Sequence, residues 1–170
     1  MLEVLLLLAV IRIRGRTGIR RPMEDTLIKL RLTRINHMVL LPEDNVYRGM
    51  LQRAKDYVTW GEVTRDVLVE ALRERALLRG RKKPSEEDLK DKLGVSSFED
   101  MADEMLKGRL LSSFDAVVPV LRLHPPRGGY EFIRKQYHNG GSTGYRGDEI
   151  NLLIRKMLKP GVDLNGKKEN

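Results

Sequence analysis

One short stretch, VIRIRGRTGIRRP at residues 10–22, constrains the fold more than any other part of the sequence. It begins as a strand in which apolar residues alternate imperfectly with arginines, and it runs into a loop with two glycines and three arginines. Glycine lets a backbone approach another molecule closely, and arginine offers a fork of donors that fits phosphate oxygens. The stretch therefore predicts a buried strand that ends in a polyanion-binding loop. A charged hairpin loop that only keeps the protein soluble is the alternative interpretation.

Basic residues are concentrated in two segments that lie far apart in the sequence. Residues 12–34 contain eight basic and two acidic side chains, and residues 122–159 contain eight basic and three acidic ones. Residues 61–109 are nearly balanced, with eleven basic and twelve acidic side chains. The net charge of +8 indicates an anionic partner, either nucleic acid or an anionic membrane surface. We expect the fold to bring the two basic segments together into one surface.

Several classes of protein are disfavoured by composition and spacing. There are no cysteines, which excludes disulfides and thiolate metal sites. The apolar run at residues 4–11 is much shorter than the roughly 20 residues of a membrane-spanning helix, and it reads as a buried strand with a short lead-in. The three histidines have no metal-ligand spacing, and GRTGIRR lacks the lysine and Ser/Thr of a nucleotide-binding phosphate loop. We therefore predict no cofactor, no metal and no enzymatic activity.

The first sixty residues predict a compact β-α-β-α-β unit. After the first strand, Pro22 suits the start of a helix that continues to about Leu32. A second strand at 37–41 precedes a helix at 46–56 whose inward side chains include Val46, and a third strand follows at 57–60. We expect both helices to cover the same face of a small sheet, in an α+β fold related to the ferredoxin-like class.

The middle of the chain, residues 62–113, reads as a helical insertion. Thr64, Ser85 and Ser97 are each positioned to cap a helix, the last two with an aspartate three residues later. The methionines there read as core residues rather than a partner-binding stripe. The basic run at 79–84 is either an additional RNA contact or a solvated linker.

The last part of the chain predicts a strand, a long basic loop and a helix. AVVPVLRL at 116–123 reads as a strand, with Pro119 favouring a sheet edge. Residues 124–147 are rich in glycine and basic residues and contain three tyrosines on which bases or riboses could stack. This segment is predicted to be a functional loop that lacks the apolar residues to hold itself, and a mobile surface loop is the alternative. A final helix from Asp148 is stopped by Pro160, and the tail at 159–170 is expected to be frayed.

Five segments also carry a resemblance to a known family. VIRIRGRTGIRR, TLIKLRLTRINHMVLLP and YRGMLQRAKDYVTWGEV occur in that order, and LRLHPPRGGYEFIRK with HNGGSTGYRGDEINLLIRKM follows the insertion. Together they resemble the L-thirty family of large-subunit ribosomal proteins, in its long archaeal form, which is related to eukaryotic large-subunit protein L-seven. The similarity covers residues 9–158. It implies a single ribosomal unit with a core at 9–61, an insertion at 62–113 and an RNA-binding part at 114–158.

The resemblance implies a structural role in the large ribosomal subunit, in the cytoplasm. The implied partners are 23S-type rRNA, neighbouring large-subunit proteins and, as a candidate neighbour, the 5S rRNA region, with no membrane and no small-molecule substrate. A free-standing nucleic-acid-binding regulator and a small-molecule-sensing α+β domain are the alternatives.

The candidate RNA-binding residues lie in the two basic segments and beside them. The first group comprises Arg12, Arg14, Gly15, Arg16, Gly18, Arg20, Arg21, Arg31, Arg34, Asn36, His37, Tyr57 and Trp60. The second comprises Arg122, His124, Arg127, Gly128, Gly129, Arg134, Lys135, Tyr137, His138, Gly140, Gly141 and Arg146. Arginines are expected to contact phosphates, and the polar and aromatic side chains to contact ribose or base edges, although Trp60 could equally belong to the core.

Overall fold

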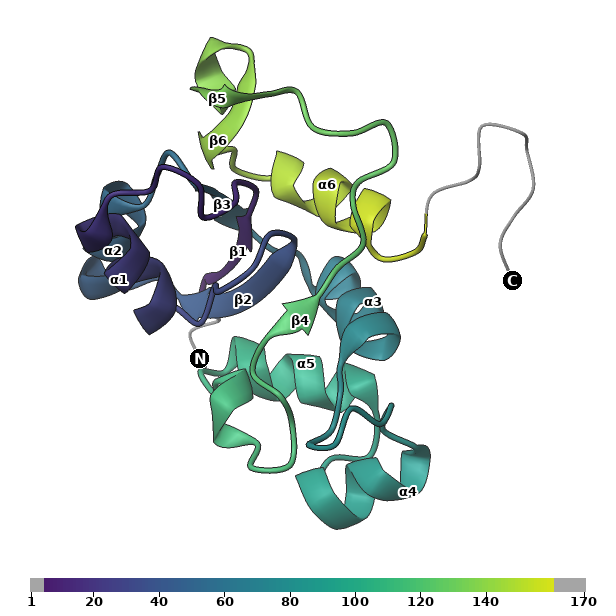
Figure 1. The fold of residues 1–170 in the computed structure, drawn as a ribbon. Helices are drawn as coiled ribbons and strands as arrows, with labels where there is room; N and C mark the ends of the chain where they lie inside the picture. The colour runs from purple at the N-terminus through teal and green to yellow at the C-terminus, as the bar shows by residue number, and fades with distance from the viewer. Residues whose placement is uncertain (1–4, 161–170) are drawn as a thin grey trace.

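The structure is a computed structural model that describes residues 5–160. Its elements, in chain order, are β1 (Leu7–Arg12), α1 (Arg21–Lys29), β2 (His37–Pro42), α2 (Asn45–Arg53), β3 (Val58–Glu62), α3 (Arg65–Arg75), α4 (Glu86–Asp88), the π-helix η1 (Leu89–Leu93), α5 (Phe98–Leu106), the 3-10 helix η2 (Leu111–Ser113), β4 (Leu121–Arg122), β5 (Phe132–Gln136), the 3-10 helix η3 (Tyr137–Asn139), β6 (Gly141–Tyr145) and α6 (Glu149–Met157). The predicted α+β class is confirmed, and Figure 1 shows the arrangement. The expected frayed tail lies mostly at 161–170, outside the described residues.

One mixed sheet organises the molecule, in the strand order β4-β2-β1-β3-β6-β5. β1 lies between β2 and β3 and is antiparallel to both, which confirms the β-α-β-α-β core. β4 adds to the outer edge of β2 in the antiparallel sense, whereas β6 joins β3 in parallel and β5 joins β6 in parallel. The first and last thirds of the chain therefore share one sheet.

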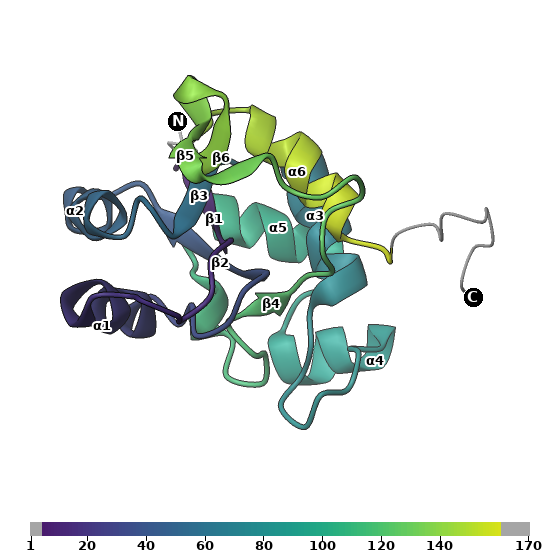
Figure 2. The same cartoon turned by 45° about the horizontal axis from the view of Figure 1, so that its top comes forward.

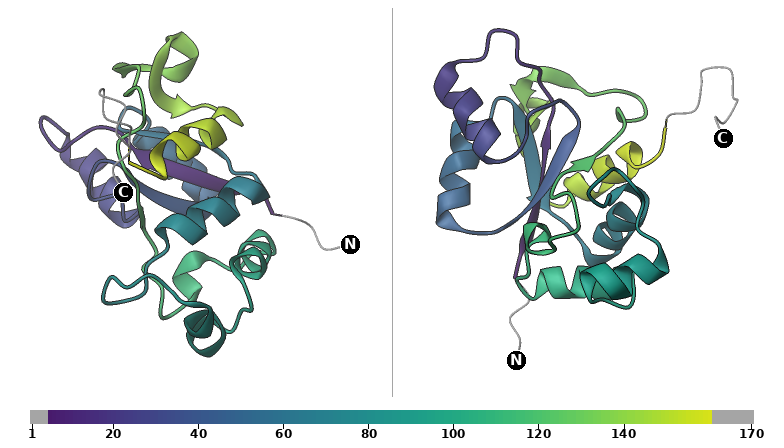
Figure 3. Two further views of the ribbon diagram at one scale, coloured as in Figure 1. Left: turned by 90° about the vertical axis from the view of Figure 1, so that its right-hand side faces the viewer. Right: turned by 60° about the horizontal axis from the view of Figure 1, so that its bottom comes forward.

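The sheet is covered on both faces, and this explains the poor alternation in β1. Successive strand residues point to opposite faces, so Leu8 and Val10 pack with α1 and α2 while Leu7, Ala9 and Ile11 pack with α3, α5 and α6. Figures 2 and 3 show the two helical layers on either side of the strands. A strand buried on both faces needs apolar residues at every position.

Local signals placed most of the helices correctly. Asp44 caps α2 by accepting from the backbone of Val46, Ser85 and Asp88 form a reciprocal capping box, and Ser97 caps α5. Thr64 makes no such side-chain cap at the start of α3. The expectation that Val46 points inward was wrong, because Val46 lies in the first turn of α2 with 67% of its surface exposed.

The C-terminal third differs most from the expectation. The strand predicted at 116–123 is reduced to the two residues of β4, although its position at a sheet edge is correct. The expectation of a structureless loop at 124–147 was wrong, since β5, η3 and β6 lie within it. α6 begins and ends as predicted, with four buried apolar side chains. Within residues 5–160, no helix is both long enough and apolar enough to cross a membrane.

Candidate RNA-binding surface

Arg12 stands at the end of β1 and is buried, with 1% of its surface exposed. Its Nε donates to the carbonyl of Arg14 and its Nη1 to the carbonyl of Leu32, each at 2.8 Å. Burial lowers the pKa of the Arg12 guanidinium, and the nearby charge of Arg16 lowers it further. A guanidinium enclosed in this way cannot reach a phosphate, so we no longer count Arg12 as an RNA contact. Instead it ties the loop after β1 to the turn after α1.

The loop between β1 and α1 presents the arginines that the sequence predicted. Arg16 is exposed and pairs with Glu24 at 2.8 Å, while Arg20 and Arg21 are exposed at the start of α1. Arg14 is half-buried and lies over the Tyr57 ring, with 4.7 Å between its Cζ and the ring centroid. Tyr57 itself is largely buried, so it supports Arg14 rather than offering a free stacking face. Gly15 and Gly18 are both exposed, and Gly18 has a φ of +73°.

The turn after α1 continues this basic surface. Arg31 and Arg34 are exposed, and Arg31 and Asn36 adopt positive φ values of 62° and 63°. This conformation is uncommon for residues other than glycine, and asparagine tolerates it best. The backbone of Asn36 donates to the carbonyl of Arg12 at 2.8 Å. The turn is thus held against the end of β1 while its arginines face solvent.

His37 starts β2 and pairs in register with Arg122 of β4. The pKa of its imidazole is lowered, first by burial and then by the charges of Arg122, Arg34 and Arg12. Its Nδ1 is buried and makes no hydrogen bond to any residue among 5–160. Burial and the cationic neighbours thus favour the neutral form of His37, which can donate or accept at a ribose or base edge without adding charge to the surface.

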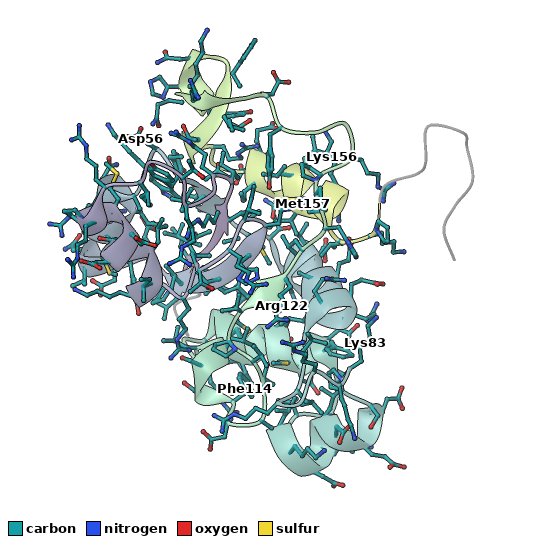
Figure 4. The ribbon with its side chains drawn as sticks, viewed as in Figure 1. Asp56, Lys83, Phe114, Arg122, Lys156 and Met157 are labelled. Atoms are coloured by element: carbon teal, nitrogen blue, oxygen red, sulfur yellow. The ribbon has the colours of Figure 1, made fainter. Side chains whose placement is uncertain are left out.

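The start of the second basic segment follows β4 and lies along α6. The backbone of His124 donates to the carbonyl of Met157, and that of Arg127 donates to the carbonyl of Lys156. Met157 and Lys156 are labelled on α6 in Figure 4. The Nε2 of His124 lies 3.1 Å from Nη1 of Arg75, and burial together with Arg75 lowers the pKa of His124. These backbone bonds hold the segment in place without using the side chain of Arg127, which is exposed.

Arg127 and its neighbours form the rim of a pocket of about 240 Å³. Gly128 and Gly129, at φ values of +82° and +75°, leave open space beside their α-carbons. Across the pocket, Arg146 lies over the Tyr137 ring at 4.8 Å. Its Nε donates to Oγ1 of Thr59 at 2.7 Å and its Nη2 to the carbonyl of Ser142 at 2.6 Å, and burial lowers its pKa. The structure therefore gathers five predicted site residues around one hollow.

The β5–β6 pair adds exposed basic residues, but two candidate residues prove to be structural. Arg134, Lys135, His138 and Gly140 are exposed. Gly141 is buried, and a Cβ at this position would lie 2.0 Å from the carbonyl oxygen of Lys135, so it is needed for the close approach of β5 and β6. Trp60 is 7% exposed and packs in the core beneath α1 and α2. Neither Gly141 nor Trp60 is retained as an RNA contact.

Three contacts join the second basic segment to residues close to the first. The backbone carbonyl of Asn36 accepts from the amide of Leu123 at 3.0 Å, and its Oδ1 accepts from the hydroxyl of Tyr130 at 2.7 Å. In addition, Nε2 of Gln136 donates to Oδ1 of Asp56, which is labelled in Figure 4, at 2.9 Å. Tyr130 was recognised in the sequence only as one of three tyrosines among basic residues, and nothing in the sequence distinguished Gln136 or Asp56.

The sequence is similar to known proteins over nearly its whole length. A family model described as ribosomal protein L30p/L7e matches residues 8–58. The large ribosomal subunit protein uL30 of Thermoplasma volcanium is 58% identical over 165 residues, which cover 96% of this chain and 100% of the relative. The proteins of the same name from Methanosphaera stadtmanae and Methanobrevibacter smithii are 46% and 43% identical, and each alignment covers 88% of this chain and 99% and 98% of the relative.

Proposed function

The chain belongs to the ribosomal protein L30p/L7e family, and we propose that it is a structural constituent of the large ribosomal subunit that binds and stabilises large-subunit rRNA. Its proposed location is therefore the cytoplasmic large subunit, with no catalytic role. Neighbouring large-subunit proteins and the 5S rRNA region are further proposed partners. The division into a core at 9–61, an insertion at 62–113 and an RNA-binding part at 114–158 is part of this proposal.

The observation that carries the proposal is the junction at Asn36. This residue contacts Leu123 and Tyr130, and the next residue, His37, pairs with Arg122. Side chains from residues 12–34 and 122–146 therefore flank a single junction, although residues 35–121 separate the two segments in the sequence. Phosphates that approach this end of the sheet would meet positive charge from both, which raises affinity through release of condensed counterions.

The proposed contacts divide by exposure. The exposed basic side chains are assigned to phosphates: Arg16, Arg20, Arg21, Arg31, Arg34, Arg122, Arg127, Arg134 and Lys135. The half-buried Arg14, Tyr137 and Arg146 are assigned to positioning the RNA and to stacking on its bases or riboses. Arg14 is already fixed over the Tyr57 ring, and Arg146 over the Tyr137 ring. Gly128 and Gly129 would let RNA approach the backbone next to Arg127.

Sedimentation tests the proposed location directly. A tagged copy of the protein, expressed in cells that provide its ribosomes, should sediment with large subunits and remain bound after washing at moderate salt. It should be released together with rRNA-bound proteins at high salt, since phosphate contacts are screened. A protein that remained at the top of the gradient under all conditions would instead support the free-standing regulator.

A further inference from the structure

A second hollow, of about 490 Å³, lies at the opposite end of the sheet from the basic surface. Among its lining residues are Glu43 just before α2, Arg48 within α2, Trp60 and Glu62 on β3, and Tyr145 at the end of β6. Leu8 of β1 pairs in register with Glu62, and Arg12 pairs with Val58. Four strand residues, or about 13 Å, thus separate this hollow from the basic end of β1. The right-hand view of Figure 3 shows the course of β1 through the sheet.

Glu62 brings a negative charge to this hollow that no cation in the described part of the chain pairs with. Its two carboxylate oxygens accept from the hydroxyl of Tyr145 at 2.7 and 2.9 Å, and this hydroxyl is a neutral donor. Within residues 5–160, no lysine, arginine or histidine nitrogen forms an ion pair with Glu62. Glu43, by contrast, pairs with Arg48 on the same wall. A half-buried carboxylate without a cation favours a positively charged ligand.

The phenol of Tyr145 reports the sign of the local potential. The hydrogen bond to Glu62 is the largest cause that raises the pKa of Tyr145 to about 12, and burial with the charges of Glu62, Asp148 and Glu43 adds to it. Three carboxylates therefore act on one hydroxyl, in a protein whose net charge is +8. A phosphate would be repelled here, so RNA does not fit this hollow.

Aromatic and apolar groups complete the hollow. The rings of Trp60 and Tyr145 lie 6.3 Å apart at 50°, and Tyr145 is 52% exposed, which leaves a ring face for a cation. Leu8 of β1 also lines the hollow, and its side chain suits the apolar stem of a long cationic side chain.

We propose that this acidic aromatic pocket binds an arginine side chain from a basic segment of a neighbouring protein. The planar fork of arginine matches the two oxygens of Glu62, and its face can stack on Tyr145. The molecule then has two binding ends of opposite sign, one for RNA phosphates and one for a cationic protein segment. This pocket is independent of the basic surface and would remain if the RNA contacts were assigned differently.

The protein provides its own reporter, because Trp60 is the only tryptophan in the sequence and lines the pocket. Purified protein is titrated with an end-blocked hexa-arginine peptide, and hexa-citrulline serves as the uncharged control. The arginine peptide should change the fluorescence of Trp60 saturably, and citrulline should not. Glu62→Gln keeps an acceptor for Tyr145 but removes the charge, and it should weaken binding about tenfold, equivalent to about 1.4 kcal/mol.

Two further variants separate a binding role from a structural one. Glu87→Gln, on exposed α4, removes one negative charge elsewhere and should bind like the parent. Tyr145→Phe frees Glu62 from the phenol and keeps the ring, so it should bind at least as tightly. The proposal is overturned if Glu62→Gln binds the peptide as tightly as the parent, or if Glu62→Gln weakens rRNA binding. Self-association of the parent that Glu62→Gln abolishes would assign the pocket to a second copy of the chain and would also overturn it.

Discussion

The hydroxyl of Tyr130 donates to Oδ1 of Asn36 at 2.7 Å and thereby joins residues that lie 94 positions apart. Asn36 is at the same time bonded through its backbone to Arg12 and Leu123. Burial raises the pKa of Tyr130, as expected for a phenol enclosed between α6 and the turn before β2. This bond is therefore a specific link between the two basic segments.

Removing that link should cost stability without removing charge. Tyr130→Phe should lower the free energy of unfolding by about 1 kcal/mol, because Oδ1 of Asn36 loses its partner. In a double-mutant cycle with Asn36→Ala, urea unfolding should give a coupling energy of about 1 kcal/mol. Purely additive effects would mean that the hydroxyl contributes nothing to the junction.

Arg12 should behave as a structural residue and not as an RNA contact. Arg12→Met leaves the carbonyls of Arg14 and Leu32 without their donors and should destabilise the protein by about 2 to 4 kcal/mol. Arg16→Ala, which affects an exposed ion pair, should change stability by about 0.5 kcal/mol or less. Urea unfolding measures both. A stable Arg12→Met variant with a reduced salt dependence of RNA binding would return Arg12 to the RNA surface.

Stability should fall on acidification below about pH 6.5. The pKa values of His37 and His124 are lowered in the folded protein from 6.5, so below that pH the unfolded chain binds more protons than the folded one. The stabilisation that the two lowered pKa values provide is complete above pH 6.5. It is lost as the pH falls toward the pKa values of the histidines in the folded protein. The double variant His37→Asn, His124→Asn should show a smaller loss between pH 7.5 and 5.5 in urea titrations. An equal loss in both proteins would assign the acid sensitivity to other groups.

Gly141 should be far less tolerant of a side chain than Gly15. A Cβ at Gly141 would meet the carbonyl of Lys135 at 2.0 Å, whereas a Cβ at Gly15 meets nothing within 4 Å. Gly141→Ala should therefore separate β5 from β6. The peptide bonds after Arg134 and Lys135 should then become more accessible to trypsin. Gly15→Ala is the matched control and should be digested like the parent. Equal digestion of the two variants would show that β5 and β6 do not approach as closely as described.

Sequence patterns were sufficient where structure depends on neighbours in the chain. The caps at Ser85 and Ser97 and the apolar spacing of α6 depend on residues within a few positions, and each was predicted correctly. The sequence also indicated that β4 lies at an edge, because Pro119 precedes it. These features follow from propensity and capping, which act over short distances.

Features that depend on distant partners were missed. β5 consists of largely exposed residues and, within residues 5–160, pairs only with β6, so neither alternation nor apolarity marked it as a strand. Arg12 looked like a surface arginine because its two carbonyl partners, at Arg14 and Leu32, are brought to it only by the fold. The sequence did not indicate whether Trp60 lies in the core or contacts RNA. In the structure it packs in the core with residues of α1 and α2.

The salt dependence of binding to purified large-subunit rRNA tests the central claim most directly, that the two basic segments form one RNA surface. Arg34→Ala and Arg127→Ala remove one exposed charge from each segment, and Lys90→Ala removes one from the insertion. Each arginine variant should reduce the slope of log affinity against log salt by about one unit, the double variant by about two, and Lys90→Ala by none. Circular dichroism confirms the fold of each variant. If Arg34→Ala lowers the slope and Arg127→Ala does not, or the reverse, the two segments do not form a shared surface.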